Sequence, residues 1–352
     1  MREIGPYRVL RAPGTGGAAR THLCRAADGL LVAVEELHPA QAPDAAARRR
    51  FARRARAARR IDGRWTLPVL DADPDAERPW LATAHAPAPD LARLLRATGP
   101  LPVATVRRLG AGLARALAAG HAAGVVHGGL EPARVLVTAH DPKLTGFGLP
   151  PAPGPDGTTG PLGYASPEQI ERPADTGPPG DVFALGALLA TAAQGRHPWT
   201  GRPRPWTTGT GGGGGGGGGI GVGAEDARAV RQRTVDGRPD LADVPGALLP
   251  ALARCLDPDP ALRPTPGQLL VLLGPGPGAA SGPWLPPAGL ALTARYAADL
   301  PRADEAGPVH LHPLIEHPLT YPHPAGPPAR APRGAPGRGV GGPRGVRGPV
   351  PG

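Results

Sequence analysis

Residues 125–137 read VVHGGLEPARVLV, and three further short sequences follow in order: KLTGFG at 143–148, GYASPEQ at 163–169 and DPALRPT at 259–265. An apolar run of about 12 residues between the third and the fourth is too short to span a bilayer and predicts a buried helix. Apolar spacing predicts helices through most of this half of the chain, at 91–98, 103–123, 181–193 and 244–256. This half is therefore expected to be mainly helical.

The residues that precede this half predict a small sheet with one helix. Between 7 and 37, apolar and polar residues alternate around turns at PGTGG and AADG, which predicts three strands. Residues 45–61 contain neither glycine nor proline and place Phe51, Ala55 and Ile61 at helical spacing, which predicts a helix. Residues 66–84 predict a hairpin, because two short apolar runs flank the turn DPDAERP.

The composition argues against several functional classes. The formal net charge is +10, but the arginines are accompanied by no aromatic platform, so no nucleic-acid module is expected. Cys24 and Cys255 lack the spacing of a disulfide framework or a zinc site, and MREIGPYRVL lacks a signal-peptide core. A cytoplasmic protein without a membrane segment is the expectation.

In this order, a Gly-rich turn, a VAVE strand, a helix and the four sequences quoted above resemble the motif series of bacterial Ser/Thr protein kinases, above all the actinobacterial ones. The resemblance covers about residues 5–273. It implies an α+β, two-lobed protein kinase-like fold, with an antiparallel β-sheet and one αC helix in the N-lobe and a mainly helical C-lobe.

The resemblance also implies a division of the chain. The N-lobe is expected at 5–86 and the C-lobe at 87–273, with a flexible insertion at about 201–223 that contains an unbroken glycine run. Residues 274–352 are rich in Pro, Gly and Arg and are expected to be a disordered tail, in which only 289–300 could form a short helix.

Several positions that bind phosphate in the family hold other residues here. Gly14 and Gly16 match the Gly-rich loop, but Ala19 replaces its third glycine. Glu35 stands at the position of the phosphate-binding lysine, and Arg54 at that of the αC glutamate. We predict that Glu35 and Arg54 form a swapped salt bridge. The register could instead select Arg53, or both side chains could point to solvent.

The positions that perform catalysis in the family are changed as well. Gly129 replaces the aspartate that orients the substrate hydroxyl, and Glu131 replaces the lysine near the transferred phosphate. Arg134 and Gly146 replace the two metal ligands. Lys143 resembles an ordinary surface lysine of the family rather than a relocated catalytic one, and Asp141 is interpreted as a turn residue. Neither a metal site nor binding of ATP and magnesium is expected.

Residues that resemble the structural ones of the family are retained. Glu168 and Arg263 are expected to form a buried ion pair that ties the activation segment to the C-lobe. Asp181 is expected to accept hydrogen bonds from the backbone near His127, and His127 and Phe147 belong to the internal spine. A remnant of the nucleotide pocket is expected from residues that match its walls and hinge: Gly14, Gly16, Ala33, Thr83, Ala84, Ala86 and Leu136.

An intact frame without catalytic residues favours a pseudokinase that acts as a protein-binding scaffold or allosteric regulator, with no cofactor. Two alternatives remain at this point. One is an active serine/threonine kinase that transfers phosphate from ATP. The other is a basic interaction protein in which the arginines between Arg48 and Arg60, together with those of the tail, bind an anionic partner.

Overall fold

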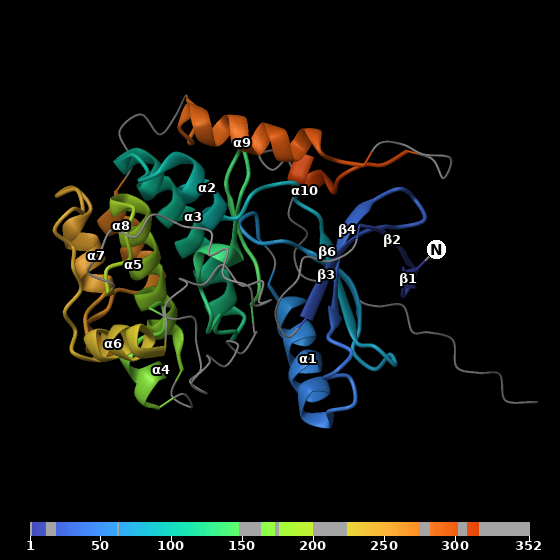
Figure 1. Cartoon of the computed structure of the whole chain (residues 1–352), viewed down its shortest axis with the longest axis horizontal. Coiled ribbons are helices and arrows are strands. Elements are labelled where there is room, and N and C mark those ends of the chain that lie inside the picture. The colour runs from blue at the N-terminus through green and yellow to red at the C-terminus, as the bar shows by residue number, and fades with distance from the viewer. Residues whose placement is uncertain are drawn as a thin grey trace, which may run out of the picture.

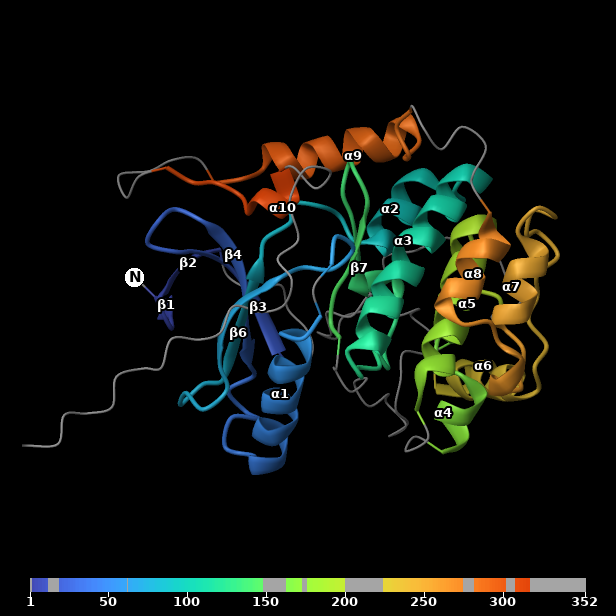
Figure 2. The ribbon, with the colours of Figure 1, turned by 180° about the vertical axis from the view of Figure 1, so that it is seen from behind.

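The computed structural model describes residues 2–11, 19–61, 63–147, 163–172, 176–199, 224–274, 282–301 and 308–316. It has two lobes, a sheet with one long helix and a helical bundle, and a C-terminal segment that runs along both (Figures 1 and 2). No helix among these residues has both the length and the apolar character needed to cross a bilayer.

The N-lobe is a six-stranded antiparallel sheet in the order β1-β2-β3-β4-β6-β5. Its elements are β1 (Glu3–Ile4), β2 (Tyr7–Arg11), β3 (Ala19–Arg25), β4 (Leu31–Leu37), α1 (Ala45–Ala58), β5 (Val69–Asp73) and β6 (Trp80–Ala84). Asp44 caps α1 by accepting a hydrogen bond from the N–H of Ala46. The predicted strands, helix and hairpin are all present.

Two faces of this sheet have different roles. Cys24, Val32 and Val34 pack with Tyr7 and Trp80 on the face away from α1. On the other face, Leu37 and Leu81 pack against Ala47, Phe51 and Ala55 of α1. Because side chains alternate along a strand, Glu35 lies on the same face of β4 as Leu37, toward α1.

The C-lobe is built around α5, an almost wholly buried helix. Its elements are α2 (Leu91–Thr98), α3 (Val103–Ala122), η1 (Pro132–Arg134), β7 (Val135–Val137), β8 (Pro142–Leu144), α4 (Pro167–Glu171), α5 (Pro178–Gln194), α6 (Ala224–Val235), α7 (Leu249–Cys255), η3 (Pro260–Leu262) and α8 (Pro266–Leu273). The seventh helix begins later than predicted, because Pro245 opens a turn to Leu248 before it. The predicted glycine-rich insertion at about 201–223 lies outside the described residues.

The expectation of a disordered tail is wrong for residues 282–301 and 308–316, although the short helix considered possible at 289–300 is present. They contain α9 (Pro287–Ala298) and α10 (Pro313–Glu316), and Trp284, Leu285 and Leu314 are buried. Composition misleads here because these few large side chains bury enough apolar surface to hold a Pro-rich segment against the lobes. We call residues 282–316 the C-terminal strap; 302–307 within it lie outside the described residues.

Candidate functional site

Glu35 and Arg54 form the predicted swapped pair between β4 and α1. Two guanidinium nitrogens of Arg54 donate to the two carboxylate oxygens of Glu35, a bidentate arrangement. The side chains are only 6% and 18% exposed for Arg54 and Glu35, whereas Arg53 lies on the exposed side of α1. Burial alone would raise the pKa of Glu35, but the charge and hydrogen bonds of Arg54 outweigh it and hold that pKa below its usual value.

The loop that follows α3 keeps its shape through Asp181 at the start of α5. The Asp181 carboxylate accepts hydrogen bonds of 2.8 Å from the backbone N–H groups of His127 and Gly128, as predicted from the sequence. His121 Nε2 lies 2.7 Å from the same carboxylate, a partner that sequence reasoning missed. The His127 ring packs edge-on against Phe147 at 4.9 Å between centroids. These contacts fix the loop without any catalytic group.

The positions at which the resemblance implies catalytic residues lie in this loop and beside it. The N–H of Gly129 donates to His127 Nδ1 at 3.2 Å, so its backbone serves the turn and it has no side chain to offer a substrate. Arg134 Nε lies 3.7 Å from the Glu131 carboxylate. Burial raises the pKa of Glu131 in spite of that charge. Gly146 has a φ of 87°, a conformation that favours glycine.

Glu168 and Arg263 form the predicted buried ion pair. Arg263 donates from both terminal nitrogens to the two Glu168 oxygens, at 2.7 and 2.9 Å, and its side chain is 0% exposed. It also donates to the carbonyls of Asp257, Pro179 and Pro258. The pair therefore joins α4, the start of α5 and the turn before α8.

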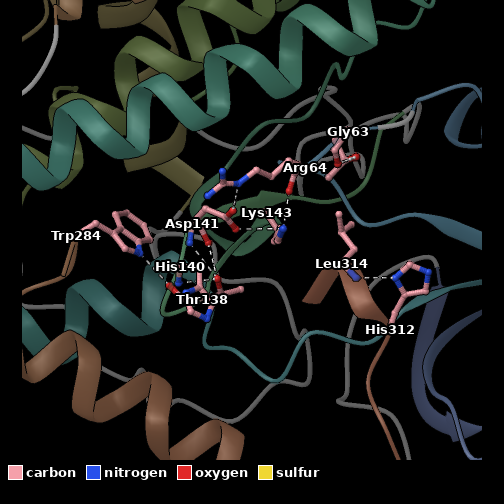
Figure 3. Close-up of polar contacts among 10 residues, drawn as sticks. Gly63, Arg64, Thr138, His140, Asp141, Lys143, Trp284, His312 and Leu314 are labelled. Carbon is pink, nitrogen blue, oxygen red and sulfur yellow. Dashed lines mark hydrogen bonds and ion pairs between the residues drawn. The ribbon is translucent and has the colours of Figure 1, made fainter. Parts of the chain in front are cut away.

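The prediction that Lys143 lies on the surface is wrong. Its side chain is 1% exposed, and Nζ donates to the carbonyl of Arg64 and lies 3.1 Å from Asp141 (Figure 3). Asp141 also accepts from Arg64 at 2.7 Å, so it is an ion-pair partner as well as the turn residue expected. Lys143 is buried because β8 packs against α3. This cluster ties the loop after α1 to the C-lobe, which is a structural role.

Of the residues predicted to form a nucleotide-pocket remnant, Ala33 and Ala86 line the same cavity. A cavity of about 400 Å³ is roofed by Thr21, Leu23 and Ala33 and reaches Ala86 after β6. Thr83, Ala84 and Leu136 are not among the described residues that line it, and Gly14 and Gly16 lie outside the described residues. Sequence reasoning missed Arg11, His85 and Arg93 in the lining of the cavity. It also missed the whole contribution of the strap, which is Tyr296, Asp299 and Leu300.

Metal-ligating groups do not converge in this region. In the portion of the chain that the structure describes, no group of three or more His, Cys, Asp or Glu side chains is placed to hold an ion. At the two positions where the resemblance implies metal ligands, Arg134 carries a positive charge and Gly146 has no side chain. Neither has the chemistry of a magnesium ligand.

Comparison with known proteins finds similarity to protein kinases. The family model described as protein kinase domain matches residues 7–210. The chain is 36% identical over 282 residues to the serine/threonine-protein kinase AfsK of Streptomyces coelicolor, covering 78% of this chain and 32% of that protein. It is also 36% identical over 277 residues to the probable serine/threonine-protein kinase PkwA of Thermomonospora curvata, covering 77% of this chain and 34% of that protein. The chain thus spans about a third of the length of these relatives.

Proposed function

The chain belongs to the protein kinase family, and we propose that within it this protein is a pseudokinase, which acts by binding another protein rather than by transferring phosphate. The observation that carries the proposal is the bidentate contact between Arg54 and Glu35. A working kinase needs an ammonium at the position of Glu35 to hold the ATP phosphates. Here a carboxylate occupies it, and Arg54 of α1 is already paired with that carboxylate.

The charge at this position opposes nucleotide binding. Two like unit charges at about 4 Å repel by roughly 4 kcal/mol when the effective dielectric constant is near 20. The lowered pKa of Glu35 keeps its carboxylate ionised at neutral pH. An arriving phosphate would therefore meet a negative charge, and it would have to compete with Glu35 for Arg54.

The metal side of the site supports the same proposal. Magnesium binds oxygen ligands, and kinases supply them from the positions of Arg134 and Gly146. The Arg134 guanidinium is a cation beside Glu131 and would repel the ion. Gly129 leaves the substrate hydroxyl without a base. Loss of phosphate, metal and base positions together is what removes turnover.

The retained contacts explain how such a protein keeps its fold. The Asp181 hydrogen bonds, the His127–Phe147 contact and the Glu168–Arg263 pair all hold the C-lobe in shape, and none of them requires a nucleotide. A stable kinase-shaped surface is what a scaffold or an allosteric regulator offers a protein partner. We further propose a reducing, cytoplasmic setting, since Cys24 and Cys255 are both free and buried.

An active serine/threonine kinase is the second candidate, and the names of the relatives favour it. Incubation of the purified full chain with magnesium, γ-labelled ATP and a generic basic protein substrate separates the two. We expect no label above a protein-free blank. Magnesium-dependent incorporation would establish the active kinase if it disappears in Ala33→Trp. The indole would fill the cavity roofed by Ala33, so loss of the label in this variant shows that the activity does not come from a contaminating enzyme.

A further inference from the structure

The C-terminal strap is anchored on the C-lobe at its beginning. The Trp284 indole N–H donates to the carbonyl of Thr138 at 3.1 Å (Figure 3). The Thr105 hydroxyl donates to the carbonyl of Trp284 at 2.8 Å. Trp284 and Leu285 are 5% and 4% exposed and belong to the main core. α9 then packs along α2, where Gly289 allows close approach to Leu94.

The far end of the strap is attached to the N-lobe. The N–H of Leu31 donates to the carbonyl of His310 at 2.9 Å, and the N–H of His310 donates to the carbonyl of Gly29 at 3.1 Å. His310 therefore adds a parallel bridge to the turn between β3 and β4. Arg11 of β2 donates to Asp299 at 3.0 Å. The described parts of the strap are thus bonded to both lobes, and Figures 1 and 2 show α9 beside the C-lobe and α10 near the sheet of the N-lobe.

Between these two attachments the strap forms a wall of the 400 Å³ cavity. Tyr296, Asp299 and Leu300 face the cavity opposite the sheet and the segment after β6. Tyr296 is held in place by Arg93, which donates to its hydroxyl at 2.6 Å. Ligand pockets span about 300–1,000 Å³, so a cavity of about 400 Å³ is near the small end of that range.

We propose that the described parts of the strap, residues 282–301 and 308–316, are autoinhibitory: they bridge the lobes and narrow the cavity beside Ala86 until the strap is lifted. The apparent affinity of a ligand that needs the open cavity equals its intrinsic affinity multiplied by the fraction of molecules in which the strap is lifted. Anything that detaches His310 or Asp299 from the N-lobe therefore opens the site. The inference does not depend on whether the protein catalyses phosphoryl transfer.

Gly29 offers the sharpest test. A side chain at Gly29 would place its Cβ 2.3 Å from the carbonyl oxygen of Pro308 in the strap. Gly29 also has a φ of 94°, so Gly29→Ala adds backbone strain as well. Gly99→Ala is the matched control, because Gly99 has a φ of 71° but nothing within 4 Å of a Cβ.

Two readouts in the full chain follow the strap. The first is hydrogen exchange of the Leu31 amide, which is bonded to His310. The second is the rate at which dithiobis-nitrobenzoate labels a thiol introduced by Ala86→Cys in the cavity wall; Cys24 and Cys255, both buried, give a low background. We expect Gly29→Ala to raise both rates at least about tenfold, a change that corresponds to about 1.4 kcal/mol in local opening, and Gly99→Ala to leave both nearly unchanged.

Three outcomes would overturn the proposal. Faster exchange at Leu31 without faster labelling means that the strap detaches but does not cover the cavity. No change in either rate means that the bridge to His310 does not hold the strap. Equal increases of the exchange and labelling rates in Gly29→Ala and Gly99→Ala mean that the whole fold is loosened rather than the strap alone. If Gly29→Ala does not fold, the same two rates can be measured in Asp299→Arg and in the double variant Arg11→Asp with Asp299→Arg. The labelling rate should rise in the single variant, and it should return to its original value in the double variant, in which the ion pair is restored with its charges exchanged.

Discussion

Replacing Arg263 with methionine (Arg263→Met) is expected to lower the free energy of unfolding by about 3–5 kcal/mol, because the Glu168 carboxylate would stay buried without its cation. The Arg263 side chain is 0% exposed and donates to Glu168 and to three carbonyls. Since domains are stable by only about 5–15 kcal/mol, much of the stability would be lost. Urea unfolding followed by circular dichroism measures the change.

Arg254→Met is the matched control, because Arg254 lies exposed on the neighbouring helix α7. We expect it to change stability by less than about 0.5 kcal/mol. Hydrogen bonds from Arg263 outweigh burial and lower the pKa of Glu168, so the pair should stabilise the fold above about pH 4.5 and lose its effect as the pH falls further. A loss below about 1 kcal/mol for Arg263→Met at pH 7 would contradict this account.

The second large effect concerns the position of the kinase lysine. Glu35→Lys restores the residue that active kinases carry, yet we expect it to destabilise this protein by about 3–5 kcal/mol and to confer no ATP binding. The new ammonium would face Arg54, whose side chain is only 6% exposed. Adding Arg54→Glu to Glu35→Lys should recover most of the lost stability, since the ion pair then forms in the orientation of the family. Thermal and urea unfolding of the single and double variants measure this.

Arg53 supplies the control for the pairing. It adjoins Arg54 but lies on the exposed side of α1, so Arg53→Glu combined with Glu35→Lys should rescue nothing. Equal rescue by Arg53→Glu and Arg54→Glu would show that the interaction is a general effect of charge rather than the bidentate contact. A Glu35→Lys protein as stable as the original would show that the buried pair contributes nothing.

The family resemblance was sufficient to predict much of the site. It placed Glu35 and Arg54 at the positions of the phosphate-binding lysine and the αC glutamate, and the packing of Leu37 and Phe51 between β4 and α1 agrees with that assignment. The partners of Asp181 and Arg263 followed from the family resemblance. They are present because the turns that carry them are retained.

Lys143 and the strap could not be predicted in the same way. Lys143 lies on a strand of three residues, too short for alternation to show which side is buried, and its burial comes from packing on α3. The strap has a composition typical of disordered chains, and its order depends on distant surfaces that receive Trp284 and His310. Such contacts become visible only when both lobes are in place.

The most direct test of the central claim is the melting temperature of the full chain with ATP or ADP, each with and without magnesium. The same measurement is made on Gly29→Ala, so that closure by the strap cannot be mistaken for loss of the site. We predict no magnesium-dependent rise in melting temperature for either protein, because the positions that should hold phosphate and metal carry Glu35, Arg134 and Gly146. A magnesium-dependent rise in either protein would contradict the pseudokinase account.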